Sequence, residues 1–109
     1  IAMPLNGLTK MTKIEVVVGG DHASAVRDQF HSAGATGFTS VSGVSGLGHH
    51  GYHQGRLLFN QQAALEMLIT VVPDTKSEAL VAGLRRLLEG TPGVMFVTDT
   101  YVSRPEYFS

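Results

Sequence analysis

The sequence predicts an α+β domain of the ferredoxin-like type, a four-stranded antiparallel sheet with two helices on one face. Segments rich in β-branched residues and segments of helical periodicity follow one another in the order strand, helix, strand, strand, helix, strand. The chain has 109 residues, which suits one domain with one core. A polar connection of roughly fifteen residues joins the second and third strands, where a hairpin would use two to about five. We therefore expect a small domain with a long functional loop.

The first strand is predicted over residues 13–18, where β-branched side chains alternate between the two faces. Asp21 is expected to cap the helix that follows, and Gly34 is expected to end it in a left-handed conformation. The apolar residues at helical spacing in this segment are Ala23, Val26, Phe30 and Ala33.

The second helix is predicted to open at a capping box, in which Thr75 is followed three residues later by Glu78. Gly90 is expected to close it, and Thr91, Pro92 and Gly93 then form a turn. The remaining strands are predicted over residues 38–45, 64–72 and 94–102.

The domain is expected to span residues 11–109. Residues 1–10 carry no clear period, and Met11 with the two residues after it resembles a natural translation start. We therefore interpret residues 1–10 as an unstructured leader or a cloning remnant outside the fold.

Composition argues against several classes of function. The formal net charge is −1 and no basic stripe is present, so nucleic-acid binding has little electrostatic support. No apolar run approaches the roughly 20 residues that a membrane helix needs, so membrane insertion is not expected. The absence of cysteine removes disulfides, thiol catalysis and thiolate metal sites. A cytoplasmic location is the expectation.

The predicted sheet would have helices on one face only. Segments 67–72 and 95–97 carry apolar residues on both faces of the predicted strands, so the sheet face without helices is also apolar. Such a face favours a partner, and we expect self-association as a dimer or trimer.

Gly46, Leu47 and Gly48 stand at the start of the long loop. Glycine leaves backbone N–H groups uncovered, and such groups can cradle an anion such as phosphate. The alternative is that these glycines serve only the flexibility of the loop.

His49, His50 and His53 form a cluster that could bind zinc, copper or nickel through neutral imidazole. No cysteine or acidic residue lies between Gly46 and Asn60, so further ligands would have to come from elsewhere. Contacts to an anion and simple exposure to solvent remain alternatives for the same histidines.

Catalysis has little support in the sequence. The serines lack the strand-to-helix elbow of a nucleophile, and Asp21 with His22 is better explained as a helix start than as a proton relay. We interpret the chain as a binding module and not as an enzyme.

Four short motifs follow one another along the predicted frame: Lys13-Ile14-Glu15, Gly37-Phe38-Thr39, Gly46-Leu47-Gly48 and Phe96-Val97. Their order and spacing over residues 11 to about 104 resemble those of PII signalling proteins. Within that superfamily the chain is most similar to the carboxysome-associated PII-like (CPII) group.

The resemblance implies a homotrimer with an adenine-nucleotide cleft between neighbouring subunits. It also implies that the loop over about residues 47–62 is a T-loop, which reports the state of the cleft to a partner protein. The residues it assigns to nucleotide binding are Val17, Gly37, Phe38, Thr39, Gly46, Leu47, Gly48, His49, Thr91, Pro92, Gly93 and Arg104.

The sequence departs from the PII pattern at the phosphate side of this cleft. Thr91, Pro92, Gly93 and Val94 replace Gly-Asp-Gly-Lys, so the lysine is missing. A charge-assisted hydrogen bond contributes about 1.5 to 3 kcal/mol, and its loss favours ADP or AMP over ATP. The loop also lacks the Tyr-Arg-Gly-Ala-Glu-Tyr signature, so uridylylation is not expected. The acidic residue that typical members place near the adenine aligns with Ile69.

The likeness to the carboxysome-associated group further implies a link to inorganic carbon, with bicarbonate as a second ligand. Its candidate residues are Gly46, Gly48, Arg56 and Arg104. The implied protein target is a bicarbonate transporter or a carboxysome-related protein. Two alternatives remain open: a trimeric divalent-metal-binding protein of the ion-tolerance type, which would use His49, His50 and His53, and a small ferredoxin-like enzyme or structural oligomer.

Overall fold

The computed structural model describes residues 5–44 and 64–109. Its elements follow the predicted order. They are β1 (Thr9–Gly19), the 3-10 turn η1 (Gly20–His22), α1 (Ala23–Ser32), β2 (Thr39–Val44), β3 (Leu65–Val72), α3 (Asp74–Glu89), β4 (Gly93–Val102) and the 3-10 turn η3 (Pro105–Tyr107).

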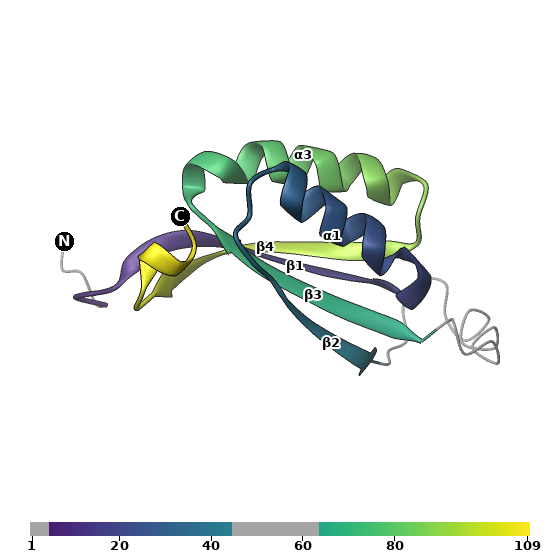
Figure 1. Cartoon of the computed structure of the whole chain (residues 1–109), viewed down its shortest axis with the longest axis horizontal. Coiled ribbons are helices and arrows are strands. Elements are labelled where there is room, and N and C mark those ends of the chain that lie inside the picture. Colours follow the sequence, from purple (N-terminus) through teal and green to yellow (C-terminus); the bar gives the residue numbers. More distant parts are fainter. Residues whose placement is uncertain (1–4, 45–63) are drawn as a thin grey trace.

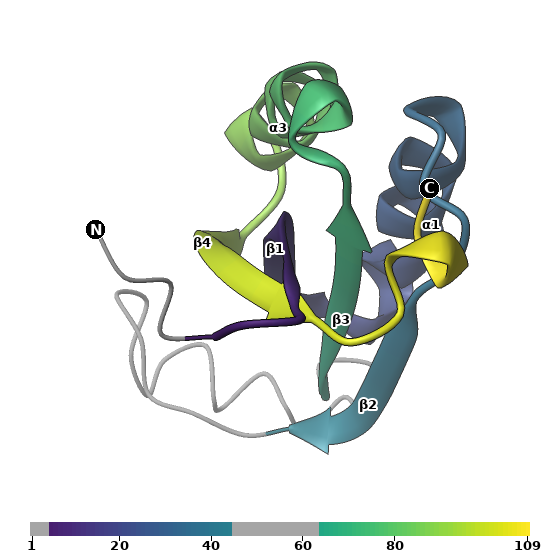
Figure 2. The ribbon, with the colours of Figure 1, turned by 90° about the vertical axis from the view of Figure 1, so that its left-hand side faces the viewer.

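The four strands form one antiparallel sheet in the order β2-β3-β1-β4. Both helices lie on the same side of this sheet (Figure 1), and the view along the strands separates the helix layer from the sheet layer (Figure 2). The predicted ferredoxin-like fold is therefore confirmed. Among the described residues, no helix has the length and apolarity needed to cross a membrane.

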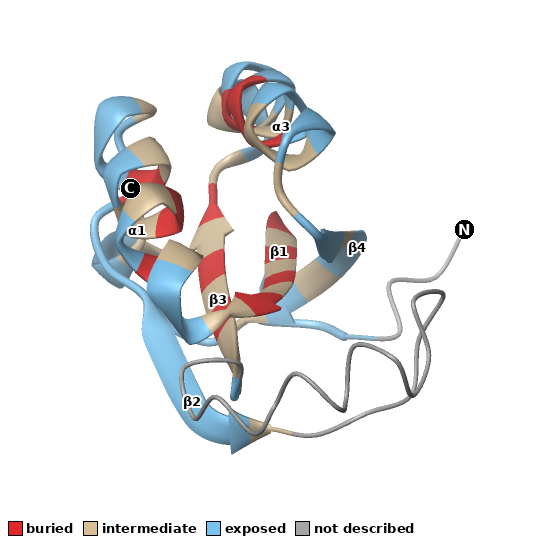
Figure 3. Ribbon diagram, turned by 90° about the vertical axis from the view of Figure 1, so that its right-hand side faces the viewer, coloured by how far each residue is buried: buried red, intermediate tan, exposed pale blue. Residues whose placement is uncertain are grey.

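The core lies between the sheet and the two helices. Ile14, Val16 and Val18 alternate along β1 and are fully buried beneath the helices, as the β-branched pattern predicts. Phe30 of α1 and Leu84 of α3 are the helical counterparts, at 1% and 0% exposure. Figure 3 shows the buried positions gathered on β1, β3 and the inner sides of the helices, while β2 is exposed along most of its length.

The other face of the sheet is open and apolar. Partners in the strand register share a face, so Val41, Met67, Val17 and Val94 form one continuous row across all four strands. Val41 and Val94 at its ends are 43% and 50% exposed, and Phe96 in the adjoining row is 54% exposed. The expectation of a bare apolar face is confirmed.

The helix starts differ from the expected caps. Asp21 lies inside η1, which continues directly into α1, and the N–H of Ala23 already bonds to the carbonyl of Gly20, so no side-chain cap forms. α3 begins at Asp74 after Pro73, one residue before the predicted capping box, and it also has no side-chain cap. The end of α1 agrees with the prediction, because Gly34 has φ +87°.

The N-terminal boundary of the fold requires a correction. β1 begins at Thr9, so Thr9 and Lys10 belong to the sheet and pair with Val102 and Tyr101. Lys10 Nζ also lies 2.7 Å from Asp74 Oδ2, and Thr12 Oγ1 donates to Asp74 Oδ1 over 2.7 Å. The long β4 strand and the start of α3 supply partners that a local reading of residues 1–10 could not reveal.

Candidate functional site

The segment that leads into β2 is fixed to its neighbours by side-chain hydroxyls. Thr70 Oγ1 donates to the carbonyl of Gly37 over 2.6 Å, and Thr36 Oγ1 donates to the carbonyl of Tyr107 over 2.9 Å. Thr39 then begins β2 and pairs with Ile69. Gly37 and Thr39, two of the residues predicted to bind the nucleotide, are therefore held against β3, close to the C-terminal turn.

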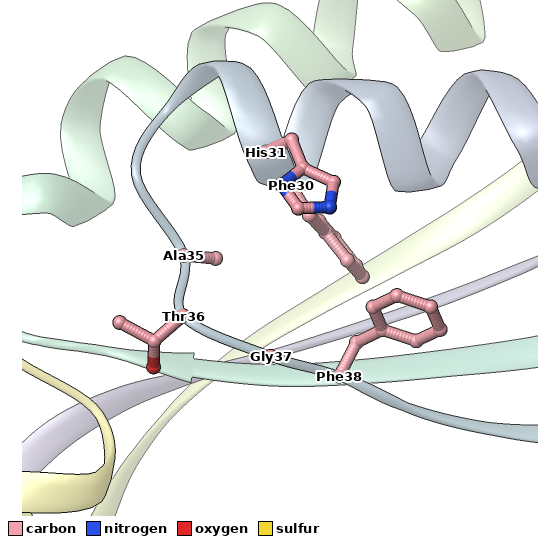
Figure 4. Close-up of a pocket in the computed structure, with 6 residues that line it drawn as sticks. All are labelled: Phe30, His31, Ala35, Thr36, Gly37 and Phe38. Atoms are coloured by element: carbon pink, nitrogen blue, oxygen red, sulfur yellow. The ribbon is translucent and has the colours of Figure 1, made fainter.

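Phe38 turns its side chain toward the helices. Its ring centroid lies 6.1 Å from that of Phe30, and Arg27 Cζ lies 5.8 Å from the centre of its ring. Arg27 is itself paired with Glu66, at 3.2 Å between Nη1 and Oε2. Figure 4 shows Phe38 directed toward Phe30 across a hollow of about 280 Å³, which His31 also lines. Phe38 is thus held in place by the helix layer.

A second hollow of about 300 Å³ lies where β2, β3 and the C-terminal turn meet. It is lined by Gly37, Phe38, Thr39, Ile69, Thr70, Val71, Tyr107 and Phe108. Its volume is at the lower end of the range of ligand sites, so it could hold part of a nucleotide but not the whole molecule. The sequence reasoning assigned the first three residues here and placed Ile69 near the adenine, but it missed Tyr107 and Phe108.

Arg104 reaches this second hollow through Tyr107. Its Nη1 donates to the Tyr107 hydroxyl over 3.0 Å, and its Cζ lies 5.7 Å from the centre of the Tyr107 ring. The signal in the sequence is short: Arg104 and Pro105 are followed two residues later by two aromatic residues at the end of the chain. The sequence pattern does not show that Tyr107 contacts Arg104, because this contact depends on the fold of η3.

Gly93 and Val17 lie together near the start of β4. A Cβ on Gly93 would lie 2.7 Å from Val18 Cγ1 and 2.8 Å from the carbonyl oxygen of Val17, so only glycine allows β1 and β4 to approach this closely. Thr91 is attached to the end of α3 through its N–H and the carbonyl of Leu88, at 3.5 Å. Gly93, one of the predicted nucleotide-binding residues, therefore lies directly beside Val17.

The predicted nucleotide residues nevertheless form two groups within one chain. We call Gly37, Phe38, Thr39, Arg104 and Tyr107 the first half-site, and Thr91, Pro92 and Gly93 the second half-site. Val17 and Ile69 lie between them, on the inner strands β1 and β3. β2 and β4 are the two edges of the sheet, with β3 and β1 between them, so their edges lie about 14 Å apart at the usual strand spacing. β4 also separates Gly93 from Arg104 by about 30 Å along its axis. One chain alone does not bring the two half-sites together.

Several predicted residues lie outside the described part of the chain. These are Gly46, Leu47, Gly48, His49, His50, His53 and Arg56, and with them the whole of the predicted T-loop. Within residues 5–44 and 64–109, no group of three potential metal-binding side chains is found.

A four-stranded antiparallel sheet covered on one face by two helices matches the ferredoxin-like fold of PII proteins. The chain belongs to the nitrogen regulatory protein P-II family, whose family model matches residues 11–107. This confirms the resemblance drawn from the four sequence motifs. No curated protein matches the chain.

Among solved structures, the chain is similar to CPII, a nitrogen regulatory PII-like protein from Thiomonas intermedia K12. The complex of CPII with ADP, AMP and bicarbonate is 36% identical, with a TM-score of 0.80 over 93% of this chain and 95% of that chain. Its complex with ADP, AMP and acetate is 35% identical, with a TM-score of 0.76 over 93% and 96%. GlnK of B. subtilis with ATP is 19% identical, with a TM-score of 0.58 over 91% and 85%, and shares the fold.

Proposed function

We propose that this protein is a regulatory sensor that binds an adenine nucleotide between neighbouring subunits of a homotrimer. The observation that carries the proposal is the separation of the two half-sites on opposite edges of the sheet. A cleft between subunits would place the first half-site of one chain against the second half-site of the next. The resemblance to PII proteins implies the same arrangement.

The symmetry of such an assembly follows from the two edges. Contacts between two different surfaces of identical chains are heterologous, and they close into a ring when the rotation between subunits permits. Each chain of the ring would then use its first half-site toward one neighbour and its second half-site toward the other. The apolar row from Val41 to Val94 would be covered by the same association, which would remove its apolar surface from water.

The charges of the half-sites favour a nucleotide with few phosphates. Arg104 is the cation that the described first half-site supplies, and the second half-site carries Val94 where the PII pattern has a lysine. A triphosphate would lack a countercharge at that position, so ADP or AMP should bind more tightly than ATP. The CPII complexes contain ADP and AMP, which supports this preference.

Bicarbonate is the proposed second ligand. Support comes from the CPII complex that contains it, and the proposed ligand residues are Gly46, Gly48, Arg56 and Arg104. The T-loop would then report adenylate and inorganic-carbon status to a cytoplasmic target, such as a bicarbonate transporter or a carboxysome-related protein. The nucleotide is a signal in this scheme and is not consumed.

Calorimetric titration of the metal-free protein with AMP, ADP and ATP, with and without bicarbonate, tests the proposal. We expect ADP or AMP to bind ahead of ATP, and Arg104→Ala to weaken ADP binding about tenfold or more because a charged hydrogen bond is lost. Arg85→Ala removes an exposed arginine from α3 and serves as the matched control. Chromatography of the recovered ADP should show it unchanged.

The absence of binding heat with every adenylate would contradict the proposed function. Equal losses in the Arg104→Ala and Arg85→Ala variants would remove Arg104 from the site. Titration with zinc, copper and nickel in the same buffers would then test the alternative that His49, His50 and His53 bind metal.

A further inference from the structure

Arg104 and Tyr107 form a joined pair at the C-terminal end of the chain. A guanidinium has five N–H donors and no acceptor, so the 3.0 Å contact is donated by Arg104 Nη1 and accepted by the Tyr107 hydroxyl. Cζ of the same guanidinium lies 5.7 Å from the ring centre, on the side of the ring that carries the hydroxyl. Tyr107 therefore contacts the arginine through its hydroxyl, which the ring holds in place.

The backbone of η3 holds Tyr107 where these contacts form. The N–H of Tyr107 bonds to the carbonyl of Arg104 over 3.0 Å, and that of Phe108 bonds to the carbonyl of Pro105 over 2.9 Å. The carbonyl of Tyr107 accepts the Thr36 hydroxyl over 2.9 Å, which ties the turn to the segment before β2. Tyr107 is 61% exposed as a residue, yet its main chain is bonded on both sides.

The same tyrosine lines the second hollow beside Gly37, Thr39 and Ile69. The position of Arg104 is thereby coupled to the wall of the hollow. An arginine side chain loses rotamer entropy when a ligand fixes it, and a contact that already restricts it reduces this cost. One Nη1 hydrogen is engaged by Tyr107, and the guanidinium has further N–H donors for an anion.

We propose that Tyr107 is a positioning residue for Arg104. The hydroxyl of Tyr107, held by its ring, orients the guanidinium toward a phosphate group of the bound adenine nucleotide. This inference rests on the proposed function and adds a residue that the sequence reasoning did not assign. Tyr107 acts through Arg104, so its contribution depends on the presence of both the arginine and the phosphate.

The test compares ADP with adenosine, which lacks phosphate, in calorimetric and competition titrations. Tyr107→Phe removes the hydroxyl and keeps the ring, and we expect it to weaken ADP binding about three- to tenfold, the value of one hydrogen bond. Adenosine binding should stay unchanged. Tyr101→Phe, at an exposed tyrosine of β4, is the matched control and should leave both ligands unaffected.

A double-mutant cycle separates positioning from a structural role. In the Arg104→Ala background, Tyr107→Phe should cause no further loss of ADP affinity, because the group that it positions is gone. Tyr107→Leu, which removes the ring as well, should weaken ADP more than Tyr107→Phe does. Circular dichroism of each variant checks that the fold is retained.

Three results would overturn the inference while the proposed function stands. They are unchanged ADP affinity in Tyr107→Phe, an equal loss for ADP and adenosine, and tighter ADP binding, which would mean that Tyr107 competes with the phosphate. Failure of the unsubstituted protein to bind ADP would overturn the proposed function itself and this inference with it.

Discussion

Single residues set the spacing between strands and the form of the hollows. Thr70 is 2% exposed, and its hydroxyl satisfies the carbonyl of Gly37, so the segment before β2 is anchored by one buried bond. Arg27 fixes Phe38 from the other side, and Glu66 compensates its charge. These contacts place the candidate ligand residues on a rigid support, which a binding site requires.

The tightest constraint at this scale is Gly93, whose missing Cβ lets β4 approach β1. We expect Gly93→Ala to destabilise the fold by about 1 to 3 kcal/mol, because the new methyl group would overlap backbone and side-chain atoms of β1. Urea unfolding followed by circular dichroism measures the effect. Gly90→Ala is the control, since an added Cβ there meets nothing within 4 Å. Equal changes in both variants would mean that the close approach at Gly93 carries no special cost.

At the scale of elements, one ionic cluster joins the N-terminal end of β1 to the start of α3. Lys10 Nζ lies 2.7 Å from Asp74 Oδ2 and 3.5 Å from Asp99 Oδ1. The hydrogen bonds from Lys10 and Thr12 hold the pKa of the Asp74 carboxyl below its usual value, and the bond to Asp74 raises the pKa of Lys10. All the charged groups are exposed to solvent, so screening limits their contribution.

This cluster predicts how stability depends on pH. A carboxyl whose pKa is lower in the folded state stabilises the fold above its unfolded pKa, and the contribution is lost as the pH falls through the folded value. The stability of Asp74→Asn should therefore fall less steeply with decreasing pH, below about pH 4, than the stability of the unsubstituted protein. Thermal unfolding between neutral and acidic pH measures this.

Asp28→Asn, at an exposed aspartate of α1, is the control for the general effect of removing a negative charge. The interpretation fails if the profiles of both variants flatten to the same extent. Lys10 shows the opposite dependence on pH. Because its pKa is raised in the folded state, its contribution to stability is present at neutral pH and is lost as the pH rises through the folded pKa.

At the scale of the whole molecule, the open face of the sheet is the surface that we expect to form the contacts between subunits. Phe96 lies opposite Glu15 in the register and is 54% exposed. Phe96→Lys would place a positive charge beside Glu15, which preserves the isolated fold, but it would bury that charge if the face is covered by other subunits. We expect this variant to sediment as a monomer where the unsubstituted protein sediments as a trimer.

Ala82→Lys, at an exposed position of α3 on the helix side, is the matched control and should remain trimeric. Sedimentation velocity over a range of concentrations distinguishes the states. A trimer that persists in Phe96→Lys would show that this end of the open face is not part of the interface.

The order of elements, the core and the family could be predicted from the sequence, because each depends on short-range pattern. Because side chains alternate along a strand, Ile14, Val16 and Val18 lie on one face of β1 whatever packs against it. Gly34 ends α1 because its left-handed conformation favours glycine. The second face was predicted to be apolar for the same reason. The family motifs are likewise short stretches of sequence, so they can be identified without knowing which residues contact one another.

Tertiary structure alone decided what depends on residues far apart in the sequence. Asp74 contacts Lys10 and Thr12, so the start of α3 and the true beginning of β1 at Thr9 are set by partners more than sixty residues away. The separation of the half-sites follows from the strand order, which local pattern does not encode. The contact between Arg104 and Tyr107 needed the fold of η3. Periodicity records which side chains share a face, whereas the packing of whole elements determines which faces and ends meet.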